Sequence, residues 1–534
     1  MPGTDVKFPE LSDDQIARLT PLGETRQAQS GEVLYDQGDE HHGIFLVLDG
    51  SLEVAAISQV LTRGMFTGEV NQLSGRRSLV RCQARETSTV VEVSRANLRH
   101  IIENDAELSE IFLRAFLLRR VFLIRNSVGD AVLIGSSNSA DTLRLQGFLS
   151  RNGHPHTYLD VEHDPDTQAV LDQFGVSLSD IPVLICRATL VLRNPTNAQA
   201  AECFGLNAGI DEENVYDLMV VGAGPSGLAA AVYGASEGLS VLVVETNAPG
   251  GQAGSSSRIE NYLGFPAGIS GQELAGRAFV QAEKFGARIA VARSARALEC
   301  ARQPFAVALD DGKSVKSRTV IIASGVEYRR PDLPNLAKFE GVGVYYGATN
   351  IEAGICRDEN VAVVGGGNSA GQAAVFLSSF AKHVYLMVRG PCLASTMSRY
   401  LISRIEACRE ITLMTFTVIE ALEGDEHLKR IHWRNKQTGE TGVYDIPHVF
   451  MMTGALPNTA WLNGCLALDA KQFIKTGADA GSDWPLGRSP YLLETSLPGV
   501  FAVGDVRSGS MKRVAAAVGE GSMAVQFVHK VLAE

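Results

Sequence analysis

The sequence predicts an α/β protein of several domains, and three observations support this fold class. Between residues 215 and 534, an apolar strand runs twice into a glycine turn and then into a helix of small residues. Strand and helix patterns alternate between residues 128 and 205, which is typical of a small layered α/β domain. Short apolar runs separated by glycines fill residues 1–125. A chain of 534 residues is long enough for several such domains.

The composition is that of an ordinary globular protein, with 45% hydrophobic and 20% charged residues. The net charge of -12 argues against a nucleic-acid partner, which would need a basic surface. No run of about 18 apolar residues occurs, so no membrane span is predicted. The N-terminus lacks the basic and apolar regions of a signal peptide, and we therefore expect a cytoplasmic protein.

The eight cysteines are scattered, and none forms a Cys-x-x-Cys pair. Zinc spacing and a local redox pair are therefore absent, and no metal ligand is predicted. We expect most of these cysteines to be reduced thiols. Their spacing leaves a long-range disulfide open.

Residues 1–125 predict a small antiparallel barrel with helices at its ends. The segment L-S-D-D-Q-I-A-R-L has the pattern of a helix that Ser12 caps. Strands of about five residues follow, with glycines at the corners. Helical periodicity returns from Arg95 to about Val121.

Residues 128–205 read as strand, helix, strand, helix, strand and strand. The strands are A-V-L-I-G, H-T-Y-L-D-V, I-P-V-L-I-C and A-T-L-V-L-R-N-P. The acidic stretch N-A-G-I-D-E-E-N, residues 207–214, is the expected linker to the glycine-rich part.

The first glycine turn is Gly222-Ala223-Gly224-Pro225-Ser226-Gly227, after an apolar strand at 217–221. In G-x-G-x-x-G the first glycine permits a tight turn, the second lets a pyrophosphate approach the backbone, and the third lets helix and strand pack closely. The helix N-terminus offers free N–H groups to the phosphates. Glu245 ends the next strand, where a carboxylate accepts hydrogen bonds from ribose hydroxyls.

The second glycine turn runs from Gly365 through Gly367, Asn368 and Ser369 to Ala370, after a strand at 361–364. The next strand is predicted to end at Arg389 instead of an acid. A guanidinium pairs with a ribose 2'-phosphate, whereas a carboxylate repels it, so NADPH is favoured over NADH.

Two dinucleotide sites on one chain indicate electron transfer between a nicotinamide and a flavin. Near the end of the chain, Gly504 and Asp505 follow an apolar strand, where the carboxylate can bind the ribityl hydroxyls of FAD. A helix follows Lys512, Arg513 and Val514, and its positive N-terminus would stabilise an anionic reduced flavin.

These motifs together resemble the low-molecular-weight thioredoxin reductase family over residues 215–534. The order of G-A-G-P-S-G-L, G-G-Q, R-I-E-N-Y-L-G-F-P, I-I-A-S-G-V-E-Y-R-R, the second turn and T-G-A-L-P-N-T matches throughout. The resemblance implies an FAD domain at 215–329 and 454–534, with an NAD(P)H domain inserted at 330–453. It also implies a homodimer, and FAD contacts at Gly222, Ala223, Gly224, Gly227, Glu245, Gly251, Gln252, Asn261, Ala323, Ser324, Gly325, Asp505, Arg513 and Val514.

Two departures from this family bear on function. Its Cys-Ala-Thr-Cys dithiol reads Gly347-Ala348-Thr349-Asn350 in this sequence. Its His-Arg-Arg phosphate clamp reads Val388-Arg389-Gly390, so one arginine remains. Intramolecular dithiol chemistry is therefore not expected.

The stretch F-T-G-E-V-N-Q-L-S-G-R-R-S-L-V-R, residues 66–81, resembles the cyclic-nucleotide-binding domains of the catabolite activator family. In that arrangement Gly68 frees a helix N-terminus, Glu69 takes the ribose 2'-hydroxyl, and Arg77 and Ser78 bind the cyclic phosphate of a ligand such as cyclic AMP. The alternative is a barrel that has lost its ligand and serves as a docking or dimerisation module.

The segment 128–205 weakly resembles a thioredoxin-like domain. Ile181-Pro182 falls where that fold has its cis-proline, and Ser137-Asn138-Ser139-Ala140 stands where its dithiol would be. The resemblance implies a spacer or a platform for protein docking.

The leading hypothesis is an FAD-dependent NAD(P)H oxidoreductase of thioredoxin reductase type, with cyclic nucleotide as a regulator. Without a dithiol, electrons would pass to a partner's disulfide, a ferredoxin- or flavodoxin-like protein, or a quinone. The alternative is a non-catalytic sensor that binds FAD, pyridine nucleotide and cyclic nucleotide. We expect no catalytic side chain, because hydride transfer depends on positioning.

Overall fold

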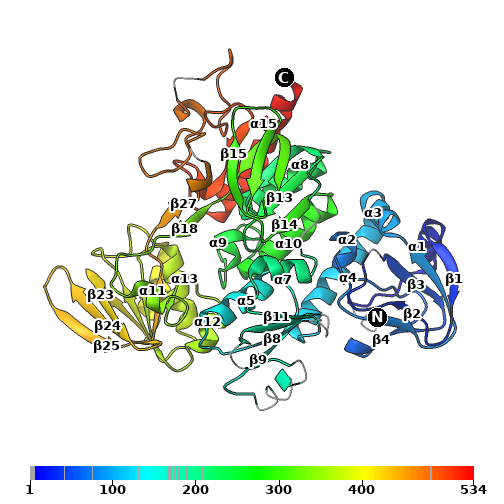
Figure 1. Cartoon of the computed structure of the whole chain (residues 1–534), viewed down its shortest axis with the longest axis horizontal. Helices are drawn as coiled ribbons and strands as arrows, with labels where there is room; N and C mark the ends of the chain where they lie inside the picture. Colours follow the sequence, from blue (N-terminus) through cyan, green and yellow to red (C-terminus); the bar gives the residue numbers. More distant parts are fainter. Residues whose placement is uncertain are drawn as a thin grey trace. The chain divides into compact units, whose positions relative to one another are not determined.

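The computed structural model describes residues 7–40, 42–74, 76–129, 131–164, 167, 171–172, 175–177, 180–186, 190–206, 210–462, 464–481 and 484–534 (Figure 1). The chain forms two compact units. The first contains Met1–Gly135, Asn152–Gly209 and Glu283–Gly286, and the second contains Ser136–Arg151, Ile210–Ala282 and Ala287–Glu534.

The N-terminal part of the first unit is built from short antiparallel strands in two sheets, of order β1-β7-β3 and β2-β6-β4-β5. The strands are β1 (Glu24–Ala28), β2 (Val33–Tyr35), β3 (Ile44–Asp49), β4 (Leu52–Val54), β5 (Gln59–Leu61), β6 (Cys82–Ala84) and β7 (Ser88–Val93). Alternate residues of these strands, among them Phe45, Val47 and Val90, form one buried core. The predicted antiparallel arrangement is confirmed.

Four helices accompany these sheets: α1 (Asp13–Leu19), α2 (Asn71–Ser74), α3 (Arg95–Asn104) and α4 (Ala106–Arg125). Ser12 caps α1 through a capping box with Gln15, as predicted. The prediction of one helix from Arg95 to Val121 is wrong, because two helices meet at Asp105. The Asp105 carboxylate accepts a hydrogen bond from the Leu108 N–H at 3.0 Å, so Asp105 is the N-cap of a second helix, α4.

The second part of the first unit is a four-stranded sheet of order β11-β10-β8-β9, in which β8 and β9 are parallel. Its strands are β8 (Ala131–Gly135), β9 (His156–Asp160), β10 (Val183–Cys186) and β11 (Leu190–Arg193), followed by helix α7 (Asn197–Cys203). Helix α5 (Ala140–Arg151) joins β8 to β9 in sequence. The Ile181–Pro182 peptide bond is cis. The predicted second helix and the start of the predicted linker lie largely outside the described residues.

The first sheet of the second unit has the order β14-β13-β12-β17-β16-β15, with β28 beside β17. Its strands are β12 (Val215–Val221), β13 (Val241–Glu245), β14 (Arg288–Val291), β15 (Ala295–Glu299), β16 (Phe305–Leu309), β17 (Ser314–Ile322) and β28 (Val500–Ala502). Its helices are α8 (Pro225–Ser236), α9 (Gly251–Gly254), α10 (Gly271–Lys284) and α15 (Val514–Ala533). The strands β12, β13, β14, β17 and β28 are parallel, so their carboxyl ends share one edge.

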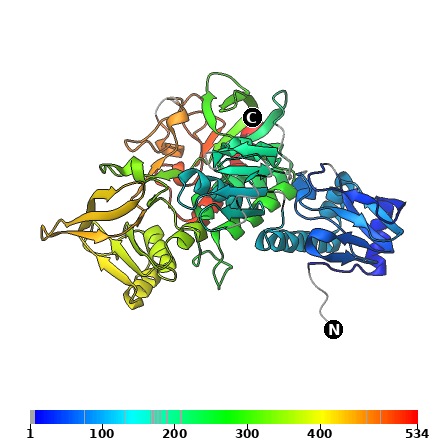
Figure 2. The same cartoon turned by 60° about the horizontal axis from the view of Figure 1, so that its bottom comes forward.

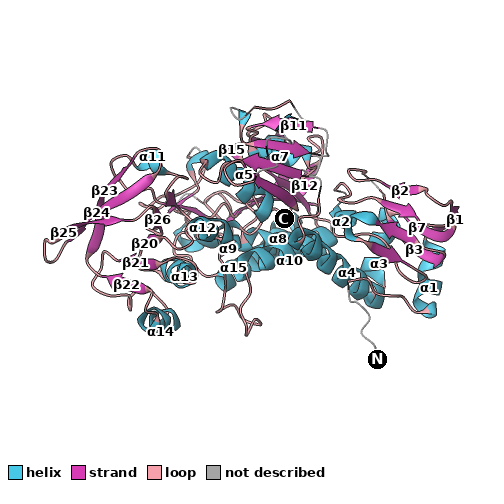
Figure 3. Ribbon diagram, turned by 90° about the horizontal axis from the view of Figure 1, so that it is seen from below, coloured by secondary structure: helices cyan, strands magenta, loops and turns pink. Residues whose placement is uncertain are grey.

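A second parallel sheet, of order β19-β26-β20-β21-β22, lies in sequence between the antiparallel pair β18 (Val326–Tyr328) and β27 (Ala455–Pro457). Its strands are β19 (Val344–Tyr345), β20 (Asn360–Val364), β21 (His383–Met387), β22 (Ile411–Met414) and β26 (His448–Met451). The helices are α11 (Leu336–Phe339), α12 (Asn350–Ile355), α13 (Asn368–Leu377) and α14 (Arg399–Ala407). Helices α13 and α14 pack beside β20, β21 and β22 (Figure 3).

A separate antiparallel sheet of order β23-β24-β25 follows β22 (Figure 2, yellow to orange). It consists of β23 (Thr417–Gly424), β24 (Leu428–Asn435) and β25 (Thr441–Asp445). Short 3-10 turns lie at Thr20–Leu22, Ala55–Ile57, Ala460–Leu462, Gly477–Asp479 and Gly504–Val506.

Two disulfides join cysteines that are distant in sequence, Cys186 to Cys203 and Cys300 to Cys465. The expectation of mostly reduced thiols is therefore wrong for half of the eight cysteines, because the fold brings together residues that are 17 and 165 positions apart. Cys82, Cys356, Cys392 and Cys408 are free. Over the described ranges, no helix combines the length and apolar character that a membrane crossing needs.

Candidate nucleotide-binding sites

The first glycine turn follows β12 and is closed by backbone packing. Gly222 has a φ of +105°, and a Cβ on it would lie 2.4 Å from the carbonyl oxygen of Ala323. A Cβ on Gly227 would lie 1.9 Å from the Gly222 oxygen. Only glycine fits at these two positions, as the roles predicted for the tight turn and the close helix packing require.

Gly224 is the N-cap of α8, and Pro225 occupies the first helical position. Gly251 approaches from α9, because a Cβ on it would lie 3.1 Å from the Gly224 Cα. Ala223 and Ser226 are buried. The structure therefore brings two predicted segments together as a main-chain surface at a helix N-terminus, which suits a pyrophosphate.

The buried Glu245 carboxylate at the end of β13 organises this turn. Its Oε2 accepts the Ala223 N–H at 2.8 Å, and its Oε1 accepts the Asn247 and Ala248 N–H groups at 2.9 and 3.2 Å. A carboxylate has about four lone-pair sites, so capacity remains for a ribose hydroxyl.

The C-terminal segment closes on the same turn. A Cβ on Gly504 would lie 2.6 Å from the Ser226 Oγ, and the Gly504 N–H donates to Glu520 at 2.7 Å. Burial raises the pKa of the neighbouring Asp505 carboxyl. Val514 begins α15, Arg513 is its exposed N-cap, and the Lys512 ammonium lies 5.0 Å from the Phe473 ring centre.

Other predicted contacts lie in loops near the strand ends. Ser324, between Ala323 and Gly325, makes two hydrogen bonds with Asn458. The Ser324 hydroxyl donates to the Asn458 main-chain carbonyl at 2.8 Å, and the Asn458 side-chain amide donates to the Ser324 main-chain carbonyl at 2.9 Å. Gln252 donates to the Val326 carbonyl at 3.4 Å. Asn261 lies in an exposed loop, and no contact among the described residues joins it to the glycine turns.

The second glycine turn has the same construction. Gly365 has a φ of +149°, and a Cβ on it would lie 2.5 Å from the Met452 oxygen and 3.1 Å from the Ala370 Cβ. Gly367 is the N-cap of α13 and faces open space. Asn368 accepts the Ser398 N–H at 2.7 Å, and Ser369 is exposed. Sequence reasoning missed Ser398 and Thr396, whose hydroxyl donates to the Gly366 carbonyl at 2.7 Å.

Arg389 is exposed and lies two residues beyond β21, which ends at Met387 and not at Arg389 as predicted. Over the described ranges it makes no ion pair. Arg404 pairs with Glu260, and the exposed Arg399 lies 3.6 Å from Glu406.

Residues 347–349 lead into α12, which begins at Asn350. Thr349 caps this helix through a capping box with Glu352, and Asn350 is its first residue. No atom lies within 4 Å of a Cβ built on Gly347. The free Cys356 is fully buried, and burial raises the pKa of its thiol well above the usual range, so it stays protonated.

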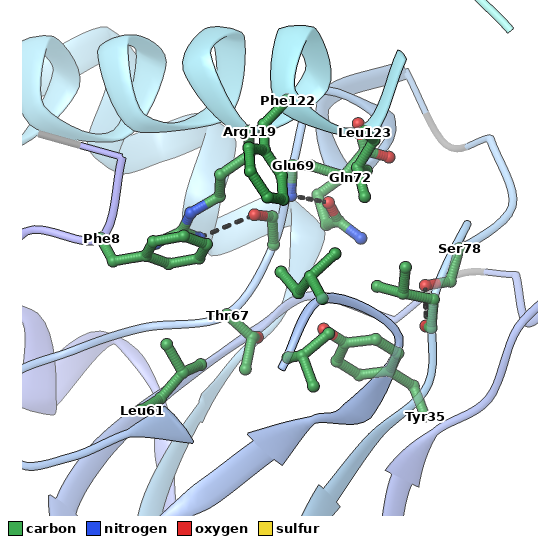
Figure 4. A pocket seen from close by; sticks show the side chains of 14 residues that line it. Phe8, Tyr35, Leu61, Thr67, Glu69, Gln72, Ser78, Arg119, Phe122 and Leu123 are labelled. Atoms are coloured by element: carbon green, nitrogen blue, oxygen red, sulfur yellow. Dashed lines mark hydrogen bonds between the residues drawn. The ribbon is translucent and has the colours of Figure 1, made fainter. Parts of the chain in front are cut away.

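A cavity of about 30 Å³ lies in the N-terminal domain between the sheets and α4 (Figure 4). Gly68, Glu69 and Ser78 line it, as the resemblance predicts. Glu69 is fully buried and lies 3.1 Å from the Arg120 Nε, and burial raises its carboxyl pKa. The Ser78 hydroxyl donates to the Val80 carbonyl at 2.9 Å.

Arg77 does not line this cavity, although the sequence places it with the other three as the phosphate ligand. Its Nε pairs with Glu40 at 2.6 Å, and its Nη1 donates to the Cys203 carbonyl at 2.9 Å. The guanidinium is held by the Glu40 carboxylate and by the last residue of α7, and this tertiary contact could not be read from the sequence.

Sequence reasoning missed Arg119, a buried arginine of α4 in the cavity wall. Its Nε donates to the Lys7 carbonyl and its Nη1 to the Gly68 carbonyl, both at 2.8 Å. The guanidinium lies over the Phe8 and Phe66 rings at 4.8 and 4.7 Å. The signal for it was an arginine within the apolar run A-F-L-L-R-R-V-F.

One further group, Asp160, Glu162 and His163, brings three possible metal-ligand atoms within 4.8 Å of one another among the described residues. It lies on an exposed strand end, where acidic groups commonly occur without a metal.

Comparison with known families assigns both parts of the chain. Residues 216–521 match the pyridine nucleotide-disulphide oxidoreductase family, and residues 25–105 match the cyclic nucleotide-binding domain. The thioredoxin reductase of Bacillus subtilis (strain 168) is 31% identical over 326 residues, which cover 61% of this chain and 97% of that protein. The thioredoxin reductase of Mycolicibacterium smegmatis is 33% identical over 322 residues, which cover 60% of this chain and 98% of that protein.

Solved structures show the same fold. The thioredoxin reductases of Lactococcus lactis and T. acidophilum align with TM-scores of 0.54 and 0.55 at 27% identity. Each alignment covers 60% of this chain. It covers 99% of the Lactococcus lactis chain and 100% of the T. acidophilum chain. The molecule thus has a thioredoxin-reductase-like α/β fold with an N-terminal cyclic nucleotide-binding domain, and the chain belongs to the pyridine nucleotide-disulphide oxidoreductase family.

Proposed function

We propose that this protein is an FAD-dependent NADPH oxidoreductase that delivers electrons to an acceptor outside its own chain. The observation that carries the proposal is the combination of two closed glycine turns with a residue 347–350 segment that contains no cysteine. FAD, when bound, supplies a centre that accepts a hydride and passes on electrons.

The residues around the first turn fit FAD. The Gly222 and Gly227 positions exclude any side chain, and the α8 N-terminus presents N–H groups to phosphate. Glu245 would orient the adenosine ribose, and Asp505 would bind the ribityl hydroxyls. The N-terminus of α15 would stabilise negative charge on the flavin. At the second turn, Gly367 and the α13 N-terminus would bind NADPH, with Arg389 at its 2'-phosphate.

Gly347 and Asn350 would form the floor of an access site instead of a redox relay. The open space around Gly347 leaves room for a small acceptor or for a surface of a partner protein. The fully buried, protonated Cys356 cannot replace the missing nucleophile. Quinones and ferredoxin- or flavodoxin-like proteins are the acceptor classes that need no dithiol on this chain.

A panel of acceptors under NADPH tests the proposal. The FAD-loaded protein should reduce a quinone or a ferredoxin- or flavodoxin-like protein and leave thioredoxin oxidised. The double substitution Gly347→Cys/Asn350→Cys should create thioredoxin reduction, since a Cβ at Gly347 meets no atom. Robust reduction of thioredoxin by the wild type would contradict the proposal, and FAD binding without turnover of any acceptor would favour a sensor.

We also propose that cyclic nucleotide regulates this activity through Arg77. Gly68, Glu69 and Ser78 line the cavity in which a cyclic nucleotide would bind. Arg77 must leave Glu40 and the Cys203 carbonyl to reach a cyclic phosphate. Ligand binding would therefore exchange a contact with α7 for a contact with phosphate, which couples the site to the neighbouring domain.

Titration with cyclic AMP tests this coupling. Wild type should show a higher melting temperature and a changed turnover rate with the ligand, and Arg77→Ala should show neither effect. Arg81→Ala is the matched control, because Arg81 pairs with Asp36 on the surface. An unresponsive wild type would contradict the regulatory proposal.

A further inference from the structure

A guanidinium outside the predicted binding motifs lies at the first glycine turn. Arg151 is the last residue of α5, and its Nη2 donates to the carbonyl of Gly251 at 3.0 Å. Gly251 in turn packs against Gly224 at the N-cap of α8. Helix α5 and these glycines belong to the same compact unit.

The surroundings of Arg151 leave part of its hydrogen-bonding capacity unused. Its Nε is buried and makes no hydrogen bond among the described residues. Burial lowers the pKa of the guanidinium, while the nearby Glu245 and Glu352 carboxylates oppose that shift. An arginine keeps its proton in any such setting, so a cation with an unused donor stands at the turn.

The two nearby carboxylates already have other partners. Glu245 accepts the Ala223 N–H of the turn and the Asn247 and Ala248 N–H groups that follow β13. Glu352 accepts the Thr349 N–H at 2.9 Å in the capping box of α12. Neither is placed as a direct ion-pair partner of Arg151 within the described ranges. An anion bound beside this half-buried cation would therefore stabilise it.

Helix α5 is fixed at both ends, which holds Arg151 in place. Near its start, the His427 Nε2 lies 3.3 Å from the Asn138 carbonyl oxygen, and Leu143 packs on the core of the second parallel sheet. Near its end, Gln272 of α10 donates to the Ser150 carbonyl. The helix therefore contacts both dinucleotide domains, and its last side chain reaches the first glycine turn.

We propose that Arg151 binds the diphosphate of the dinucleotide at the first glycine turn, so that α5 completes a site whose other ligands come from the reductase domain. Arginine suits this role because its planar donors bind phosphate oxygens in pairs. The inference rests on the proposed FAD site and adds to it a ligand from the segment that precedes residue 215.

The test is FAD binding to apoprotein, followed by flavin fluorescence, for wild type, Arg151→Gln, Arg151→Lys and Arg144→Gln. The dissociation constant should rise about 10- to 100-fold in Arg151→Gln and less in Arg151→Lys, since a charged hydrogen-bond pair is lost or weakened. Arg144 lies on the same helix and pairs with Asp141 at 3.1 Å near the surface, so Arg144→Gln should bind as wild type does.

Melting temperatures separate a ligand role from a structural one. Apo Arg151→Gln should melt no lower than apo wild type, because the substitution removes a half-buried cation that has no direct ion-pair partner among the described residues, and the stabilisation by added FAD should shrink. Wild-type affinity for FAD in Arg151→Gln, or an equal loss of stability without and with FAD, would overturn the inference. Wild type that binds no FAD would instead contradict the proposed function itself.

Discussion

At the scale of single residues, Glu245 bears most directly on the first dinucleotide site. Its carboxylate accepts one N–H group of the turn and two of the segment after β13, while the residue is only 9% exposed. In Glu245→Gln, the amide nitrogen would face an N–H group that now donates to an oxygen. We expect a loss of about 1.5–3 kcal/mol of unfolding free energy and weaker FAD binding, because hydrogen bonds to charged groups contribute about that much.

Urea unfolding and flavin fluorescence measure these two effects. Glu299→Gln is the matched control, since Glu299 ends β15 and is exposed. If Glu245→Gln keeps both wild-type stability and wild-type FAD affinity, the carboxylate does not organise the turn.

We expect the free energy of unfolding to decrease in mild acid, because His448 of β26 is held neutral in the folded protein. Burial lowers the pKa of this ring from 6.5 to about 4, and its Nδ1 lies 3.5 Å from the Tyr345 hydroxyl. The unfolded ring takes up a proton near pH 6.5, whereas the folded ring resists until about pH 4. The neutral His448 ring therefore costs the folded state no stability above pH 6.5. As the pH falls from 6.5 toward 4, the free energy of unfolding decreases by about 3 kcal/mol in all.

His448→Phe should remove this component of the acid sensitivity. The measurement is urea unfolding at several pH values between 6.5 and 4.5. His163→Gln, at an exposed position, should retain the wild-type profile. Parallel pH profiles for wild type and His448→Phe would contradict the assignment.

At the scale of elements, the strands and glycine turns could be predicted because their signals are local. The strand predicted at 217–221 is β12, and the one predicted at 361–364 is β20. The break at Asp105 was missed, since apolar periodicity continues across it. A side chain that caps a helix competes with helix continuation without changing the hydrophobic pattern.

Asp105 is the N-cap of α4, and we predict that the stability of the protein depends on this cap. Asp105→Ala removes the acceptor for the Leu108 N–H and the partner of Arg18, whose Nη1 lies 3.0 Å from the carboxylate. We expect a loss of about 1 kcal/mol of unfolding free energy, the usual cost of an N-cap. Asp105→Asn keeps a capping oxygen and should lose less. Equal stability in thermal melts of Asp105→Ala and wild type would show that α3 and α4 need no cap.

At the scale of the whole molecule, the sequence predicted which kinds of domain are present, and contacts between distant segments decided the rest. The Arg77 contact with Cys203, the cysteine pairs and the position of Arg151 at Gly251 all join segments far apart in sequence. No local pattern records such contacts, because they arise only when separate elements pack. The candidate sites were therefore predicted where one motif holds them, and missed where a second segment completes them.

The central claim is that electrons pass through FAD to an external acceptor without a dithiol at residues 347–350. Anaerobic titration of the FAD-loaded protein with NADPH, with flavin absorbance and free thiols followed together, tests it most directly. The account predicts complete bleaching at one equivalent of NADPH per FAD, with no new thiols. Consumption of a second equivalent with the appearance of two thiols, or no bleaching at all, would contradict it.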